Sequence, residues 1–289
     1  MKKILMIGPG RDVRGGISTV VNSYYELGIE KDTEIKYIPT MEDGSQIKKL
    51  IVAVKAYMEF GGCVKKYDIV HVHMAAQASF VRKSLFVQKA KKAGVKVIIH
   101  SHAADFDKYF FEESDDKNRK KIKETFALAD KVIVLSEEWA DFFGKNVCDP
   151  AKIKIIYNGV ILPQKNKTSY DDHNILMLGR LGERKGTYDL LKAIPMVLRE
   201  VPDAMFYLGG DGDIEGCKAI AANEGIQDHI KFLGWIKGTE KKNLLDKCSV
   251  FTLPSYYEGM PMSVLEAMSY GLALSLIHIS EPTRPRLIS

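Results

Sequence analysis

The sequence of 289 residues is long enough for two domains, and its 46% hydrophobic and 27% charged residues are ordinary for a soluble globular protein. No apolar run approaches the length of a membrane span, and the start of the chain is too short for the hydrophobic region of a signal peptide, so we expect neither. The four cysteines are scattered without paired spacing, which predicts reduced thiols in a cytoplasmic protein.

The net charge of +5 is unevenly distributed, because the basic excess lies within residues 1–165 and the remainder is slightly acidic. A basic N-terminal half suits an anionic partner, such as a membrane surface or a phosphorylated acceptor. A merely solvated surface is the alternative. We expect no nucleic-acid partner.

The chain opens with a buried-type strand over residues 3–8, followed by a glycine-rich loop that leads into a helix. The loop is not a dinucleotide fingerprint, because the third glycine of that motif would fall at Val13, and no acidic residue follows the next strand, over 34–38. This excludes a nicotinamide or flavin cofactor. Gly15 and Gly16 instead allow backbone amides to approach a ligand closely.

Strands and helices continue to alternate through the first half of the chain, which predicts a parallel, doubly wound α/β sheet. The further strands are expected over 68–73, 96–102, 130–136 and 152–160. A helix predicted over 47–60 combines basic positions with an apolar face. Two interpretations of this helix are open: it contacts a membrane surface, or it simply packs on the sheet.

Two of these strands end in a His-x-His pattern, His71 with His73 and His100 with His102. Alternate residues of a strand share a face, so the four imidazoles invite a zinc hypothesis. No carboxylate or cysteine cluster completes an obvious site, and histidines at strand ends commonly hydrogen-bond to the backbone. We therefore expect no metal.

The pattern restarts after a polar, non-periodic stretch over 164–172, which is predicted to be a linker. New strands are expected over 174–179, 204–209, 229–233 and 249–253. The restart predicts two Rossmann-like, doubly wound parallel-sheet domains, over residues 1–165 and 173–273. Ligands of such sheets bind at the carboxyl ends of the strands.

Two loops of the second domain carry candidate binding residues. The loop 179–186 places Arg180 and Lys185 among glycines before a helix, and fixed positive charge of this kind suits a diphosphate. The alternative is a solvated basic turn. The second loop has Glu258 before a helix and Glu266 inside it, next to a helix N-terminus that suits an anion. Here the alternative is that the carboxylates only offset the helix dipole.

The residues from Glu258 to Gly271 (Glu-Gly-Met-Pro-Met-Ser-Val-Leu-Glu-Ala-Met-Ser-Tyr-Gly) closely resemble the Glu-x7-Glu signature of retaining GT-B glycosyltransferases of family 4. The loop 179–186 resembles the Gly-Arg-x4-Lys-Gly run of the same family. Further motifs match in the correct order between residue 3 and about residue 273: 158–160, 209–212 and 233–236.

The resemblance implies the GT-B fold, in which two Rossmann-like domains face a cleft. It also implies a retaining transfer of a sugar from a UDP- or GDP-linked donor to a hydroxyl of a glycan or lipid-linked glycan. In bacteria such proteins commonly build capsule, exopolysaccharide or lipopolysaccharide. Neither a metal nor another cofactor is expected, and peripheral contact with a membrane through the basic domain remains open.

The family also implies roles for individual residues. Arg180 and Lys185 would bind the donor diphosphate, Glu258 would lie by the donor sugar, and Glu266 would hold the ribose. His102 would lie beside the donor sugar, although Ala103 replaces the glycine that usually follows it. The remaining contacts would come from backbone groups and loops at Gly15, Gly16, Gly210, Trp235, Gly259, Met260, Pro261 and Met262.

The resemblance ends after Ala273, where the family would continue with a strand and a glycine-rich turn. Residues 274–289 contain Pro282 and Pro285, which disfavour a helix or central strand, so we expect a tail foreign to the family and an incomplete second domain. Two alternatives therefore remain beside the transferase. They are a nucleotide-sugar hydrolase or epimerase of GT-B fold, and a nucleotide-binding fragment without catalysis.

Overall fold

The computed structural model describes residues 1–163, 170 and 172–277. Its contacts divide the chain into two compact units, Met1–Gly159 and a second unit from Val160 onward. The expected linker, 164–172, falls largely outside the described residues, as do residues 278–289 with Pro282 and Pro285. Among the described residues, no helix is both long and apolar enough to cross a membrane.

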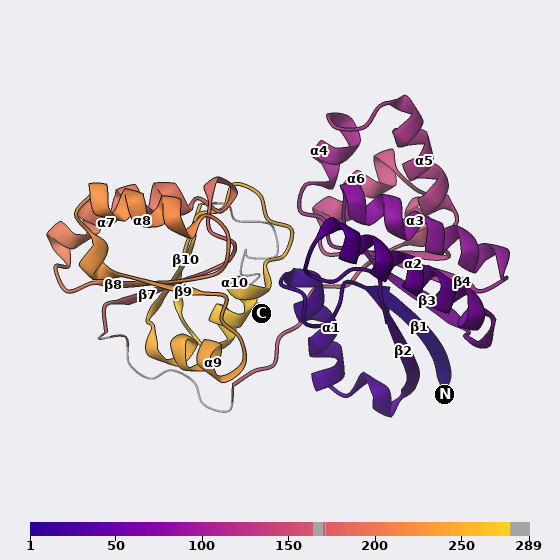
Figure 1. Ribbon diagram of the computed structural model, residues 1–289, viewed down its shortest axis with the longest axis horizontal. Coiled ribbons are helices and arrows are strands. Elements are labelled where there is room, and N and C mark those ends of the chain that lie inside the picture. The colour runs from indigo at the N-terminus through magenta and orange to yellow at the C-terminus, as the bar shows by residue number, and fades with distance from the viewer. Residues whose placement is uncertain (164–169, 171, 278–289) are drawn as a thin grey trace, which may run out of the picture. The chain divides into compact units, whose positions relative to one another are not determined.

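Unit 1 is built on a six-stranded, all-parallel sheet in the order β2-β1-β3-β4-β5-β6 (Figure 1). Its strands are β1 (Lys2–Gly8), β2 (Thr33–Pro39), β3 (Ile69–Met74), β4 (Lys96–Ser101), β5 (Lys131–Val134) and β6 (Ile153–Ile155). The strand order reverses between β1 and β3, which is where open α/β sheets bind ligands. The last strand is shorter than expected, because the chain leaves the sheet before Asn158 and Gly159.

The helices of unit 1 cover both faces of this sheet. Figure 1 shows α1 on one side and α2, α3, α5 and α6 on the other, as the reversal of the strand order requires. Their bounds are α1 (Gly16–Glu26), α2 (Gln46–Cys63), α3 (Gln77–Lys92), α4 (Phe106–Phe111), α5 (Asp116–Ala127) and α6 (Glu137–Asn146). Short 3-10 turns lie at η1 (Ile29–Lys31), η2 (Val64–Lys66) and η3 (Pro150–Lys152).

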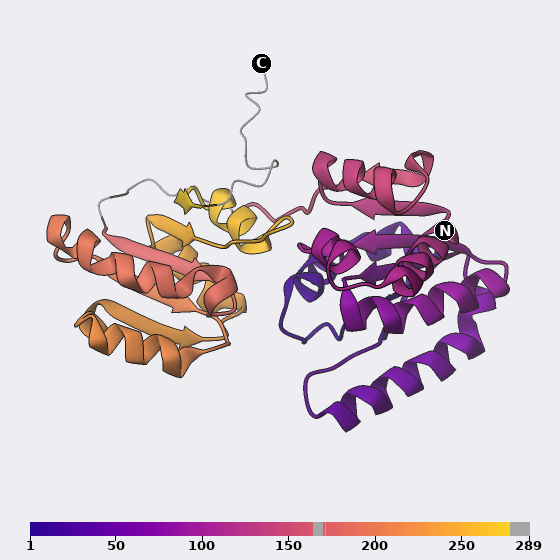
Figure 2. The ribbon, with the colours of Figure 1, turned by 90° about the horizontal axis from the view of Figure 1, so that it is seen from above.

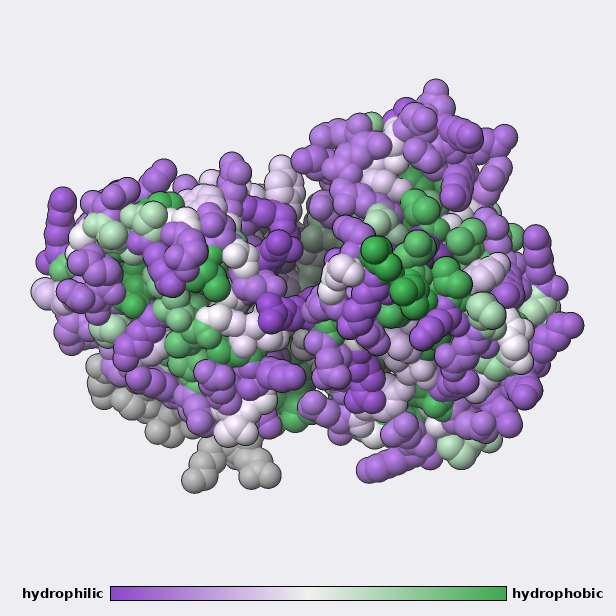
Figure 3. Space-filling model, viewed as in Figure 1, coloured by the Kyte–Doolittle hydropathy of each residue, from purple (hydrophilic) through white to green (hydrophobic). Residues whose placement is uncertain are grey.

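Helix α2 packs on the sheet through one face and leaves an apolar face in solvent. Ala56 and Phe60 are buried. The exposed side chains include Ile47, Leu50, Ile51, Val54 and Met58, which are 48–73% exposed. Figure 3 shows them as part of a hydrophobic patch over α2. Packing on the sheet therefore accounts for only some of the apolar residues of this helix, and contact with a membrane surface stays a prediction.

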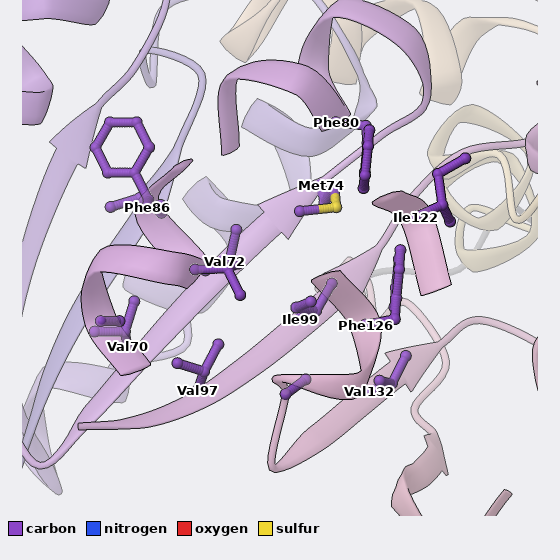
Figure 4. Close-up of a cluster of buried hydrophobic side chains, with 14 of the residues drawn as sticks. Val70, Val72, Met74, Phe80, Phe86, Val97, Ile99, Ile122, Phe126 and Val132 are labelled. Atoms are coloured by element: carbon purple, nitrogen blue, oxygen red, sulfur yellow. The ribbon is translucent and has the colours of Figure 1, made fainter. Parts of the chain in front are cut away.

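The core of unit 1 lies between the sheet and the helices α3 and α5 (Figure 4). Alternate residues of neighbouring strands point into it, because side chains alternate across a strand. These include Val70, Val72 and Met74 of β3, Val97 and Ile99 of β4, and Val132 of β5, which meet Phe80, Phe86, Ile122 and Phe126 of the helices. Each residue between them on β3 and β4 faces the other side of the sheet.

Unit 2 has a five-stranded parallel sheet in the order β11-β10-β7-β8-β9. Its strands are β7 (Asn174–Leu178), β8 (Met205–Gly209), β9 (Ile230–Gly234), β10 (Val250–Leu253) and β11 (Ala273–Leu276). Helices α7 (Thr187–Glu200) and α8 (Ile214–Asn223) cover one face, and α9 (Gly238–Lys247) and α10 (Met262–Ser269) the other (Figures 1 and 2). Two 3-10 turns lie at η4 (Glu183–Lys185) and η5 (Gln227–His229).

Two parallel, doubly wound sheets confirm the predicted α/β fold class. The structure differs from the sequence-based expectation after Ala273. Residues 273–276 form strand β11, which pairs in parallel with β10 from Val250↔Ala273 to Leu253↔Leu276. The first residues of the predicted tail therefore continue the sheet of unit 2.

Candidate functional site

Two loops of unit 2 meet where its strand order reverses, between β7 and β10. Lys185, in the loop after β7, forms an ion pair through its Nζ with Oε1 of Glu258, in the loop after β10. Their side chains are only 12% and 11% exposed. The fold thus brings together two predicted site residues that are far apart in the sequence, at the position where doubly wound sheets bind ligands.

Two hydrogen bonds to backbone carbonyls hold these two loops together. The N–H of Tyr256 donates to the carbonyl of Arg184 at 3.0 Å, and Nη1 of Arg184 donates to the carbonyl of Tyr257 at 3.1 Å. Gly186 permits the approach, because it has a φ of +64° and a Cβ there would lie 1.9 Å from the carbonyl oxygen of Pro254. Arg184, which was not among the predicted site residues, is therefore a structural link between the loops.

The pKa of Lys185 is lowered from its ordinary value. Burial is the main cause, the negative charge of Glu258 opposes it, and the charge of Arg184 adds to the lowering. A cation and a carboxylate in a partly dehydrated loop interact with a ligand more strongly than they would in water. The site can therefore present a fixed positive charge and a hydrogen-bond acceptor side by side.

The N-terminus of α10 begins beside this pair. The helix starts at Met262, and Pro261 precedes it as the N-cap residue rather than lying in its first turn. Neither the Pro261 side chain nor an acidic residue in the first turn caps the helix. Gly259, Met260 and Met262 are buried around this start. Uncapped helix N-termini attract anions.

Glu266 lies one turn further along α10 and is paired with a residue that the sequence did not single out. Nζ of Lys241, on α9, lies 2.5 Å from Oε1 of Glu266, and the two side chains are 25% and 18% exposed. Several lysines on and near α9 have the same local pattern. Only the ion pair seen in the folded structure distinguishes Lys241 from the others.

The loops after β7, β8 and β9 are joined at their glycines. A Cβ at Gly210 would lie 1.7 Å from the carbonyl oxygen of Gly179, and the N–H of Gly210 donates to the carbonyl of Gly234 at 2.7 Å. Arg180 is exposed beside this junction, and Trp235 follows β9 with 38% of its surface exposed. Arg180, Gly210 and Trp235 thus belong to neighbouring strand ends of one sheet.

Unit 1 holds the other predicted residues. Gly15 is the N-cap of α1 with a φ of +146°, and a Cβ at Gly15 or Gly16 would have no atom within 4 Å. His102 follows β4, where its N–H donates to the carbonyl of Met74 at 2.8 Å, and its Nε2 lies 2.9 Å from Nδ1 of His73. Burial, then the charges of Lys83 and His71, lower the pKa of His102 to about 3. His102 is therefore a neutral imidazole at physiological pH.

The histidines of β3 and β4 form a cluster, although no metal was expected from the sequence. One ring nitrogen from each of His71, His73 and His100 lies within 4.8 Å of those of the other two. His73 and His100 are 0% and 1% exposed.

Two family models match the chain. One is described as Glycosyltransferase Family 4 and matches residues 27–162, and the other is described as Glycosyl transferases group 1 and matches residues 161–278. Their boundary, near residue 161, is close to the division between the two compact units. The second match includes β11.

Curated relatives are also glycosyltransferases. The chain is 29% identical over 239 residues to the UDP-Gal:alpha-D-GlcNAc-diphosphoundecaprenol alpha-1,3-galactosyltransferase of Escherichia coli. This match covers 75% of this chain and 59% of that protein. It is 26% identical over 217 residues to the amylovoran biosynthesis glycosyltransferase AmsK of Erwinia amylovora, covering 71% of this chain and 52% of that protein. The chain thus spans little more than half the length of these relatives.

The fold resembles solved structures over nearly the whole chain. The sucrose-phosphate synthase of Thermosynechococcus elongatus superposes with a TM-score of 0.72 and 18% identity, and the match covers 96% of this chain and 81% of that one. This likeness concerns the fold alone. Because the two family models together match residues 27–278 and both sheets match those of GT-B structures, the chain belongs to family 4 of the GT-B glycosyltransferases.

Proposed function

We propose that this chain carries the machinery to transfer a sugar, with retention, from a nucleoside-diphosphate sugar to an acceptor hydroxyl. The observation that carries the proposal is the buried Lys185–Glu258 ion pair at the start of α10. A diphosphate needs fixed positive charge, and a sugar needs hydrogen-bond acceptors. This site offers both on loops that a nucleotide can reach from the strand ends.

Donor binding would exchange the partners of this ion pair. Lys185, together with Arg180 and the amides of residues 259–262, would bind the diphosphate, and Glu258 would then accept hydrogen bonds from the donor sugar. As the glycosidic bond breaks, negative charge grows on the leaving phosphate, and a buried cation stabilises it more than a solvated one does. The acceptor would attack from the same face through an oxocarbenium-like state, so no carboxylate nucleophile is required.

The remaining residues would position the two substrates. Glu266 would accept hydrogen bonds from the ribose, and Gly210 and Trp235 would border the base. His102, as a neutral imidazole, would bind a hydroxyl of the donor sugar. Gly15 and Gly16 would offer backbone amides at the open start of α1. Lysine, arginine and helix amides together supply the positive charge for the leaving group, so the transfer itself is assigned no metal and no cofactor.

The acceptor is proposed to be a glycan or a lipid-linked glycan in bacterial polysaccharide biosynthesis. The Escherichia coli relative is named for a UDP-Gal donor and a diphosphoundecaprenol-linked acceptor, and the Erwinia relative for amylovoran biosynthesis. The exposed apolar residues of α2 lie among Lys48, Lys49 and Lys55 and suit an anionic membrane surface. We therefore propose a cytoplasmic protein that contacts the membrane peripherally through unit 1.

The experiment that tests this proposal measures binding and turnover separately. Thermal stability of the 289-residue chain is measured with UDP, GDP and their sugar conjugates, and turnover is then measured with and without a diphosphoundecaprenol-linked glycan. Stabilisation by one nucleotide and acceptor-dependent release of it support the transferase. Release without any acceptor would indicate a hydrolase or epimerase, and stabilisation without release a binding fragment.

A further inference from the structure

The four histidines of β3 and β4 form a compact array on one face of the unit 1 sheet. His71 and His73 stack with ring centroids 4.4 Å apart, and His100 and His102 approach to 4.1 Å. The centroids of His73 and His100, which pair in register across the two strands, are 5.3 Å apart. Tyr24 of α1 lies over the array, 6.0 Å from His73. The apolar core occupies the opposite face of the same strands.

Four of the eight ring nitrogens of this array are buried without a hydrogen-bond partner. Among the described residues, Nε2 of His71, Nε2 of His73 and both ring nitrogens of His100 are buried without one. A buried polar atom left unpaired costs about 1–3 kcal/mol. Buried polar atoms without a partner call for an explanation, and a bound ligand that accepts or shares them is one.

We propose that His71, His73 and His100 bind a single transition-metal ion of the zinc class. One ring nitrogen from each lies within 4.8 Å of those of the other two. A tetrahedral zinc ion, with Zn–N bonds of about 2.0–2.1 Å, needs nitrogens roughly 3.3 Å apart, which small ring rotations can supply. Among the described residues, no carboxylate or thiolate joins the group. Imidazole ligands alone favour Zn²⁺, Co²⁺ or Ni²⁺ over Mg²⁺ and Ca²⁺.

The protonation state of the array suits metal binding. A histidine binds a metal only as neutral imidazole. Burial lowers the pKa of His71 to about 4 and, with neighbouring charges, holds the pKa values of His73 and His100 well below the usual range. Lys83 is the nearby cation that opposes an added positive charge. Burial, and then the charge of Arg82, lower the pKa of Lys83 to about 7.

The hydrogen bond between His73 and His102 matches the usual surroundings of a metal-bound histidine. Such a histidine binds the metal through one nitrogen and donates the N–H of the other to a neighbour. His73 can bind the ion through Nε2 and donate its Nδ1–H to Nε2 of His102 at 2.9 Å. His102 then carries its proton on Nδ1. The ion therefore positions His102 without taking part in the transfer, and only this last role rests on the proposed function.

The test measures the metal directly in the full 289-residue chain. We expect about one equivalent of zinc per chain after purification from zinc-supplemented cells, and visible absorption typical of tetrahedral Co²⁺ after exchange. After chelation, a hundredfold excess of Zn²⁺ over its Kd is expected to raise the melting temperature of unit 1 by roughly 5–10 °C. None of these readouts depends on sugar transfer.

Variants separate this site from other histidines. His71→Ala and His100→Gln are expected to lose the zinc and the cobalt absorption. His173→Ala, which changes an exposed histidine of unit 2 paired with Asp203, retains both. His102→Ala still binds one ion, with affinity about 10–100-fold weaker because only the supporting hydrogen bond is lost.

A wild-type chain that carries no zinc, gives no cobalt absorption and is not stabilised by Zn²⁺ would overturn the proposal. The same follows if folded His71→Ala binds zinc as tightly as the wild type. Should both variants fail to fold, the zinc titration and the cobalt spectrum of the wild type decide the question alone. A chain that binds zinc but transfers no sugar would refute the proposed function and leave the metal site standing.

Discussion

The two units are both doubly wound parallel sheets, with different strand orders, and they bury polar groups at their strand ends in opposite ways. In unit 2, the loops at the reversal of strand order carry opposite charges, which pair as Lys185 with Glu258 and, nearby, Lys241 with Glu266. In unit 1, the ends of β3 and β4 carry four imidazoles with no carboxylate among them. Paired charges are satisfied without a ligand, but each charge can exchange its partner for a group of the ligand. Neutral rings packed against each other leave nitrogens that only a ligand can satisfy.

This difference suggests that the two units bind different kinds of ligand. An ion pair that is 12% and 11% exposed can open towards an anionic ligand, because each partner can find a replacement in the donor. The histidine array, in which His73 and His100 are 0% and 1% exposed, has no such exchange and suits a permanent occupant. This difference is the reason for proposing the donor chemistry at the loops of unit 2 and a structural ion in unit 1.

The largest effect is expected from removing the cation of the unit 2 pair. Lys185→Ala is predicted to lower kcat/KM by about 10³-fold or more, because the charge on the leaving diphosphate loses a buried partner. Initial rates with the donor found by thermal shift measure this. The control is Lys218→Ala, which removes an exposed lysine paired with Glu215 on α8 and is expected to be near normal. Near-normal turnover of Lys185→Ala would remove this residue from the mechanism.

A charge-neutral double variant sharpens the same comparison. Lys185→Met leaves Glu258 buried without a partner and is expected to destabilise unit 2 by about 3 kcal/mol. Lys185→Met with Glu258→Gln removes both charges and is expected to recover most of that stability but none of the activity. Urea denaturation followed by circular dichroism gives both values. Recovery of activity in the double variant would show that the pair is only structural.

A smaller loss is expected at the second pair. Glu266→Ala is predicted to lower kcat/KM about 100-fold, because the ribose is held more weakly. Lys241→Ala is predicted to raise KM about tenfold, because Glu266 is no longer oriented. Wild type is expected to bind the 2′-deoxy or 3′-deoxy form of its nucleotide more weakly, whereas Glu266→Ala no longer distinguishes them. Lys242→Ala, the neighbouring lysine on α9, serves as the control. Equal discrimination in Glu266→Ala would contradict the ribose assignment.

A backbone test asks whether the meeting of the two loops depends on Gly186. Gly186→Ala is expected to destabilise unit 2 by about 2–4 kcal/mol, because a positive φ and a contact with the Pro254 carbonyl act together. Gly225 has a similar φ of +69°, and a Cβ added there would have no atom within 4 Å. Gly225→Ala is therefore expected to lower the stability of unit 2 by only about 1 kcal/mol. The two melting curves measure the difference. Equal costs would show that the close approach to Pro254 does not matter.

The smallest effect is a pH dependence of donor binding. Burial lowers the pKa of Lys185, and only the protonated lysine attracts a diphosphate. Nucleotide affinity is therefore expected to fall on the alkaline side at a pH below 10.5, the ordinary lysine value. Isothermal titration across alkaline pH measures the midpoint, and Lys185→Arg should move it upward because arginine keeps its charge. A midpoint unchanged by that substitution would assign the titration to another group.

Much of the fold could be predicted from the sequence because apolar runs and glycine-rich turns are local signals. The runs at residues 3–8 and 174–179 predicted β1 and β7, and the restart between them predicted a second parallel sheet. Strand β11 was missed for an equally local reason. Its residues, Ala273 to Leu276, are largely exposed at the edge of the described sheet, so burial leaves no strong pattern there.

The sequence by itself determined the fold class, the family and the identity of Lys185, Glu258 and Glu266 as binding candidates, because these depend on residue types at short spacings. Only the tertiary structure decided which charges meet. Lys185 and Glu258 are 73 residues apart in the sequence, and they meet because parallel strands bring distant loops to one edge of the sheet. The pairing of Glu266 with Lys241, rather than with another lysine of α9, also depends on the folded arrangement. The same physical reason governs the histidines, whose proximity follows from the register between β3 and β4.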